Sequence, residues 1–101
     1  MFNVSITEKG ERQVVKLSGE LDNTASRGAE KALAPVMAQA DFDVEVDCTE
    51  LTYISSSGLR LLLNIYKHQH TIGHRAIISH MSDFLKEVLT MGGFLSIFES
   101  E

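Results

Sequence analysis

Three consecutive serines, Ser55, Ser56 and Ser57, stand directly before Gly58 and carry the hydroxyls in this sequence that are best placed for chemistry. They follow a segment typical of a strand and precede one typical of a helix. Serines at a helix start accept hydrogen bonds from unpaired backbone N–H groups, so one use of these hydroxyls is capping. The other is phosphorylation, which adds a charge of roughly −1.5 to −2 and, at a helix N-terminus, need not unfold the chain.

A catalytic serine is a poor interpretation of the same segment. A hydrolase elbow places glycines two residues before and two residues after its nucleophile. Around Ser57 these positions hold Ser55 and Leu59. The sequence also has no G-x-x-x-x-G-K-[ST] phosphate loop and no H-E-x-x-H zinc motif, and its four histidines and one cysteine form no ligand pattern. We therefore expect no enzyme, no cofactor and no metal site.

Alternating apolar and polar residues predict the strands that position the serines. The clearest alternation runs from Phe42 to Cys48, and its polar side chains indicate one buried face and one wetter face. Leu51–Ser57 is expected to be a connection rich in hydroxyls. The other strands are predicted at Phe2–Ile6, Arg12–Leu17, Ala76–Ile78 and Phe94–Phe98, with a turn at Lys9–Gly10.

Three helices are predicted between these strands. The first is capped by Asp22 or Thr24, and Pro35 should kink or restart it. The second runs from about Ser56 to His70, and Gly73 closes it. The third has its cap at Ser82 and its left-handed end residue at Gly92. Their expected buried residues are Ala29, Leu33, Val36, Met37 and Ala40, then Leu59, Leu62, Leu63 and Tyr66, then Phe84, Leu85, Val88 and Leu89.

The resulting order, β-β-α-β-α-β-α-β, predicts an α/β fold. Its mixed sheet would have an opening antiparallel hairpin and parallel strands joined by right-handed helical crossovers. We expect about four to five strands and three to four helices. The 101 residues form a single domain over 1–101, and a 44% hydrophobic fraction is enough for a core.

Charge narrows the classes of partner. The formal net charge is −5, which disfavours nucleic acid and anionic membrane surfaces as partners. The apolar windows are too short to insert into a bilayer, and the start of the chain lacks the pattern of a signal peptide. Cys48 has no second cysteine to pair with and lies in the apolar phase of its strand, so it should be a buried thiol. These features indicate the cytoplasm.

Three local motifs show a resemblance to a known family. They are LSGELDNTA at 17–25, LTYISSSGL at 51–59 and LTMGGF at 89–94. The chain resembles the anti-sigma factor antagonists, the single-domain branch of the STAS family, whose motifs read G-x-L-D-x-x-T-A, L-x-x-(I/M)-D-S-S-G-L and M-(S/T)-G-(L/F). The likeness extends from about Val4 to Phe98 and implies a STAS-like fold.

The resemblance also implies a function. A family member binds an anti-sigma factor that is also a serine kinase, and binding releases the sigma factor in a bacterial cell. The kinase phosphorylates the serine before Gly-Leu, here Ser57, and a serine phosphatase reverses this. Asp22 matches the acidic residue of the turn near that serine. The implied partner-binding face comprises Asp22, Asn23, Thr24, Ser55, Ser56, Ser57, Gly58, Arg60, Met91 and Gly92.

One departure from the family pattern matters. Ser55 stands where the family usually has Asp, which leaves three adjacent hydroxyls as acceptors, Ser57 first and Ser56 or Ser55 as alternates. The departure also leaves open a different function. In that alternative the chain is a STAS binding subunit of a membrane transport system for lipids or anions and is never phosphorylated.

Overall fold

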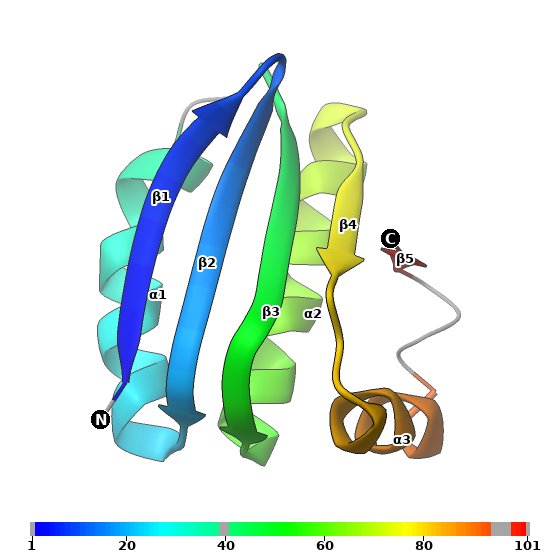
Figure 1. The fold of residues 1–101 in the computed structure, drawn as a ribbon. Helices are drawn as coiled ribbons and strands as arrows, with labels where there is room; N and C mark the ends of the chain where they lie inside the picture. Colours follow the sequence, from blue (N-terminus) through cyan, green and yellow to red (C-terminus); the bar gives the residue numbers. More distant parts are fainter. Residues whose placement is uncertain (1, 39–40, 94–97, 101) are drawn as a thin grey trace.

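The chain opens with the predicted antiparallel hairpin. Its strands are β1 (Asn3–Lys9) and β2 (Arg12–Leu21), and Gly10 in the turn has a φ of 65°. The strands β3 (Asp43–Ile54), β4 (Ala76–Ser79) and β5 (Glu99–Ser100) follow, each parallel to its predecessor. The sheet order is therefore β1-β2-β3-β4-β5 (Figure 1). The computed structural model describes residues 2–38, 41–93 and 98–100, so most of the strand predicted at Phe94–Phe98 lies outside the described residues.

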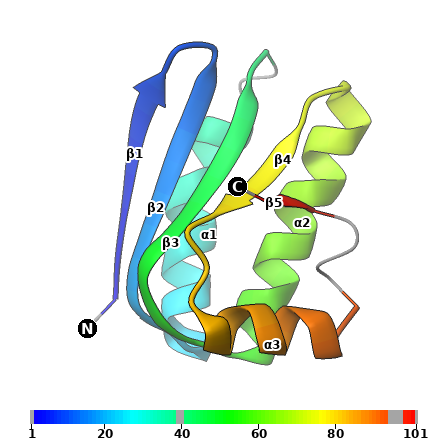
Figure 2. The same cartoon turned by 45° about the vertical axis from the view of Figure 1, so that its right-hand side comes forward.

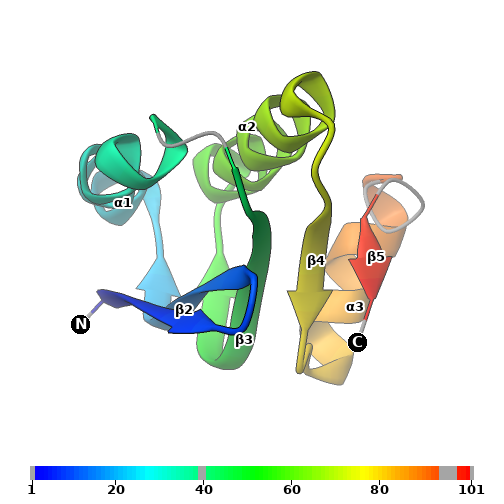
Figure 3. The same cartoon turned by 90° about the horizontal axis from the view of Figure 1, so that it is seen from above.

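Three helices connect the parallel strands, namely α1 (Asn23–Met37), α2 (Ser56–Ile72) and α3 (Asp83–Met91). Viewed from above, α1 and α2 lie together on one face of the sheet (Figure 3). The shorter α3 lies across the end of the molecule at which β4 finishes (Figure 2). This arrangement confirms the predicted α/β fold with a mixed sheet.

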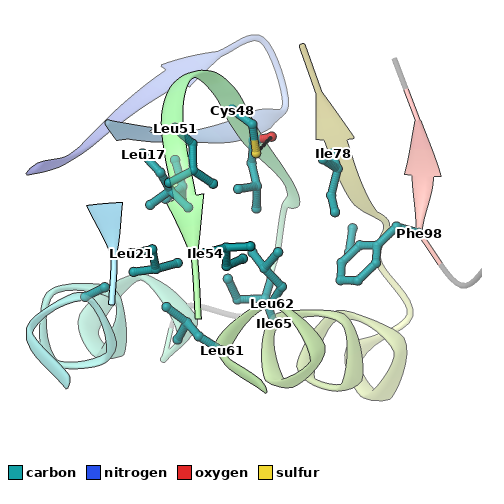
Figure 4. Close-up of a cluster of buried hydrophobic side chains, with 14 of the residues drawn as sticks. Leu17, Leu21, Cys48, Leu51, Ile54, Leu61, Leu62, Ile65, Ile78 and Phe98 are labelled. Atoms are coloured by element: carbon teal, nitrogen blue, oxygen red, sulfur yellow. Dashed lines mark hydrogen bonds between the residues drawn. The ribbon is translucent and has the colours of Figure 1, made fainter. Parts of the chain in front are cut away.

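The hydrophobic core fills the space between the sheet and the two covering helices. Leu17 and Leu21 from β2, Ile54 from β3 and Leu62 from α2 are all at most 6% exposed, and their side chains point into this space (Figure 4). Burying an aliphatic side chain of this size stabilises the fold by about 1.5–3 kcal/mol. Cys48 belongs to the same cluster, which confirms the predicted buried thiol. Burial, with a smaller effect of nearby Asp47, raises its pKa to about 12.

Two strands run further than the sequence pattern predicts. β2 continues to Leu21 and β3 to Ile54, so the expected hydroxyl-rich connection at Leu51–Ser57 is wrong for its first four residues. The pairing between these strands shifts register at Lys16/Ser18 and again at Gly19/Glu20. Each shift interrupts the apolar–polar alternation while the backbone pairing continues, which is why the pattern suggested a loop.

The structure decides the cap of the first helix and corrects other helix predictions. Asp22, rather than Thr24, caps α1. α1 does not restart at Pro35 but continues to Met37, and the bond from Ala38 N–H to the Ala34 carbonyl at 3.0 Å keeps the helical pattern beyond the proline. Phe84 is 52% exposed, since the buried side of α3 is formed by Leu85 and Leu89. Gly92 has an ordinary right-handed φ of −83°, and Gly93 adopts the left-handed conformation instead.

The buried side of α2 is also rotated from the prediction. Its buried apolar residues are Leu61, Leu62 and Ile65, because α2 packs against α1 as well as against the sheet. Of the residues predicted to be buried in the helices, Leu59, Leu63, Tyr66, Val36, Met37 and Val88 are only half-buried, and Ala40 lies outside the described residues.

Glu45 is an exception on the wetter face predicted for β3, where Asp43 and Asp47 are half-buried and Thr49 is exposed. Glu45 is only 5% exposed, and its two carboxylate oxygens are paired with Arg12 Nη1 at 2.8 Å and Ser79 Oγ at 2.6 Å. Burial raises the pKa of Glu45, but the hydrogen bonds from Ser79 and Arg12 outweigh it, so the pKa lies below its usual value. Arg12 on β2 and Ser79 on β4 thus stabilise the buried negative charge of Glu45 in the middle of the sheet.

Candidate functional site

Two neighbouring strands deliver the predicted site residues to one end of the sheet. The last residues of β2 and β3, Leu21 and Ile54, are paired in register, and Ser55 N–H donates to the Leu21 carbonyl at 2.9 Å. The next residue on each strand, Asp22 or Ser55, caps the helix that follows. The starts of α1 and α2 therefore lie side by side, as the shared sheet edge requires.

Asp22 and Ser55 have matching structural roles. Asp22 Oδ1 accepts from the backbone N–H of Ala25 at 2.8 Å, and Ser55 Oγ accepts from that of Gly58 at 3.1 Å. A serine thus provides the cap where the family usually has Asp, and the helix start does not depend on the carboxylate. Such a cap contributes about 1 kcal/mol.

Ser56 and Ser57 have no such role. Within the residues that the structure describes, neither hydroxyl makes a hydrogen bond. Ser56 is exposed and Ser57 is half-buried. From the sequence, Ser57 is the first candidate acceptor and Ser56 and Ser55 are the alternates. The structure assigns capping to Ser55 and leaves the other two hydroxyls without a hydrogen bond among the described residues.

Gly58 fixes the distance between α2 and the two strand ends. A Cβ at this position would lie 2.7 Å from Ile54 Cγ1 and 3.0 Å from Leu21 Cγ and Cδ2. Both neighbours are buried side chains that cannot move freely. Only glycine allows the first turn of α2, with Ser57 on it, to approach the sheet this closely.

A groove of about 310 Å³ lies between the starts of α1 and α2 and contains Ser57. Each helix provides four lining residues at the spacing i, i+3, i+4, i+7, which places them on one helix face. They are Asn23, Ser26, Arg27 and Glu30 from α1, and Ser57, Arg60, Leu61 and Asn64 from α2. The groove has two guanidinium groups against one carboxylate, in a chain whose formal net charge is −5.

Only part of the predicted binding face meets in this groove. Asn23, Ser57 and Arg60 line it together. Thr24 and Ser56 are exposed but do not line it, and neither do Met91, which is 82% exposed, or Gly92 at the end of α3. Five further residues of the groove were not predicted from the sequence, although their helical spacing from Asn23 and Ser57 is a signal for them: Ser26, Arg27, Glu30, Leu61 and Asn64.

No group of three or more His, Cys, Asp or Glu side chains in residues 2–38, 41–93 and 98–100 is placed to hold a metal ion. Over the same residues, no helix has the length and apolarity needed to cross a membrane.

Comparison with known proteins identifies the family. The model of a family described as "Mlab, STAS domain" matches residues 4–97. The chain belongs to the STAS domain family. A STAS relative from Bordetella bronchiseptica, named "Putative anti-sigma factor antagonist BtrV", is 30% identical over 82 residues, which are 81% of this chain and 71% of the relative.

Solved structures show the same STAS fold. The unphosphorylated form of the anti-sigma factor antagonist SpoIIAA aligns with a TM-score of 0.81 and 20% identity, over 100% of this chain and 88% of that one. The phosphorylated form of SpoIIAA, described as a Bacillus cell fate determinant, aligns with a TM-score of 0.75 and 20% identity, over 100% and 91% of the two chains.

Proposed function

We propose that this protein is an anti-sigma factor antagonist that acts by binding an anti-sigma factor with serine kinase activity, so that a sigma factor is released. The observation that carries the proposal is the different placement of the three serines. Ser55 is engaged as the helix cap, whereas Ser57 lies unengaged in the groove between α1 and α2. The name of the Bordetella bronchiseptica relative supports the same function.

The binding face comprises the two helix starts and the turns that lead into them. Asp22, Asn23 and Thr24 are exposed at the start of α1, and Ser56 and Arg60 are exposed at the start of α2. Met91 and Gly92, exposed at the end of α3, extend this face. The protein acts by docking, as the substrate of its partner's kinase activity, and works in the bacterial cytoplasm without a cofactor.

Phosphorylation of Ser57 switches the complex off. The phosphoryl group brings a charge of roughly −1.5 to −2 into the docked surface. Burying that charge against a partner surface that fits the unmodified hydroxyl is unfavourable, and a loss of about 3 kcal/mol weakens binding more than a hundredfold. A serine phosphatase restores the hydroxyl and with it the binding.

Two measurements test this function. Mass spectrometry of the protein from its native cells should find phosphate on Ser57 and not on Ser55, whose hydroxyl oxygen is engaged with Gly58 N–H. In binding assays with the purified anti-sigma factor kinase, Ser57→Asp should weaken the complex about a hundredfold. Ser5→Asp is the matched control, because it adds the same charge at an exposed serine on β1, outside the binding face. Unchanged affinity of Ser57→Asp would overturn the switch.

Ser55 is the observation that favours a second candidate function. Its hydroxyl replaces the family's usual carboxylate at the cap, so this chain keeps the helix start without the acidic residue of the phosphorylated members. The candidate is an unphosphorylated STAS binding subunit of a membrane transport system for lipids or anions. Absence of phosphate under growth and stress conditions, with transporter components captured by the chain, would establish it in place of the first.

A further inference from the structure

Two arginines from different helices lie at the same groove as Ser57. Arg27 comes from α1 and Arg60 from α2, and both line the groove of about 310 Å³ that contains the serine. Neither guanidinium forms a salt bridge with a residue in the described part of the chain. The other charged side chain of the lining is Glu30.

The spacing suits a ligand that is attached to Ser57. Arg60 is three residues after Ser57 on α2, so the two side chains share one face of the helix. Arg27 faces the same space from α1. The groove of about 310 Å³ leaves room for a phosphorus atom with its three oxygens.

The chemistry of the two guanidinium groups indicates which kind of ligand the groove would bind. Arginine is always charged at physiological pH and forms two parallel hydrogen bonds to a phosphate, an arrangement that lysine cannot reproduce. Two guanidiniums without carboxylate partners are therefore a receptor for a dianion. We propose that this groove holds the phosphoryl group of phosphorylated Ser57, with Arg27 and Arg60 as its hydrogen-bonding partners; the inference rests on the proposed function of Ser57.

This arrangement gives the switch a second effect. The phosphoryl group adds negative charge to the docking face and also engages the two cations at its centre. In the unmodified complex, an acidic group of the partner pairs with Arg27 or Arg60. After phosphorylation, both arginines are bound to the phosphoryl group and this pairing is lost. The partner is thus excluded by repulsion and by competition for the same two arginines.

The test uses the whole chain with phosphoserine inserted during synthesis, either at position 57 or, as the matched control, at position 56. The readout is the second ionisation of the phosphate, followed by phosphorus NMR, which is near pH 6 for an unperturbed group. The charged residues that line the groove with position 57 are Arg27, Arg60 and Glu30, and Asp22 caps the neighbouring start of α1. We expect a pKa lower by roughly one unit at position 57 than at position 56.

Substitutions of the groove residues then show which side chains cause the pKa shift of the phosphate. R27Q combined with R60Q should return the pKa at position 57 to the value at position 56, and Glu30→Gln should lower it further by removing the opposing charge. Equal values at the two positions, or a shift that persists in the double arginine variant, would overturn the proposal. Because no kinase takes part, this result is independent of the proposed function, whose failure would appear as unmodified Ser57 in cells.

Discussion

The two ends of the parallel strands differ in how their polar groups are used. At the amino-terminal end, Asp43 accepts from Arg75 N–H at 2.9 Å and contacts His74 Nδ1 at 3.0 Å, and Gln69 Nε2 donates to two backbone carbonyls. At the carboxyl-terminal end, Ser57 and Arg60 line an open groove without such partners among the described residues. Groups that bond to each other stabilise the fold, whereas unpaired groups that line an open groove are accessible to another molecule. Gln69 Oε1 is also unpaired among the described residues, but it is buried.

The first prediction concerns the close packing of α2 against the strand ends at the carboxyl-terminal end. Gly58→Val should lower the free energy of unfolding by about 3 kcal/mol, because the new side chain collides with Ile54 and Leu21. Urea titration followed by circular dichroism measures it. Gly28→Val is the matched control, since Gly28 lies in α1 with no atom within 4 Å of an added Cβ, and its effect should stay within about 0.5 kcal/mol. Equal losses at both glycines would show that the close approach of α2 is not needed.

The second prediction concerns the hydrogen bonds of Gln69 at the amino-terminal end of the parallel strands. Gln69 is 1% exposed, and its Nε2 donates to Phe42 O at 2.9 Å and to Arg75 O at 3.1 Å. Gln69→Leu keeps the volume and removes both bonds, while Arg75 O retains the bond from Val44 N–H. Phe42 O loses the bond from Gln69, whereas the variant also removes Gln69 Oε1, which is buried without a partner among the described residues. The stability should therefore fall by only about 1 kcal/mol. Binding of the partner should be unchanged, so a variant that loses affinity while still folded would contradict the division between the two ends.

The third prediction concerns two glycines at which alanine should change the stability in opposite directions. Gly28→Ala should stabilise the chain by about 0.5–1 kcal/mol, because alanine restricts the unfolded chain and its Cβ points into open space. Gly58→Ala should change stability in the opposite direction. Thermal unfolding of the two variants side by side measures both signs. A gain at both positions would mean that α2 can move away from Leu21 and Ile54 at little cost.

The fourth and smallest effect concerns pH. The Arg75 backbone N–H holds the pKa of Asp43 below its usual value, with His74 contributing in the same direction and burial opposing it. A carboxylate with a lowered folded pKa stabilises the fold above its unfolded pKa of about 3.9, and this stabilisation is lost as the pH falls through the folded value. The parent chain should therefore be more stable than Asp43→Asn near neutral pH, and this difference in the free energy of unfolding should shrink as the pH falls below about 4. If the stability difference between the parent chain and Asp43→Asn does not change with pH, the charge of Asp43 does not stabilise the fold.

Much of the fold could be predicted because most elements carry a regular pattern. The hairpin turn at Gly10, the caps at Asp22 and Ser82 and the closing Gly73 all lie where the sequence places them. The ends of β2 and β3 could not be predicted in the same way, because the register shifts between those strands remove the alternation on which a strand prediction depends.

The candidate site was predictable only in part for a different reason. The motif locates Ser57 and Arg60 on one helix, but which side chains face them is decided by how α1 packs against α2. Arg27 and Glu30 therefore become site residues only in three dimensions. Glu45 shows the same limit, since a carboxylate on the expected wet face is buried by Arg12 and Ser79 from neighbouring strands.

The buried position of Cys48 gives the protein a built-in reporter of unfolding. It is the only cysteine in the sequence and lies, 1% exposed, on β3, the middle strand of the sheet. A thiol-specific reagent needs the thiolate and direct access, so labelling requires that the sheet open first. The labelling rate then measures the free energy of that opening in the parent chain and in each variant above, without any added probe.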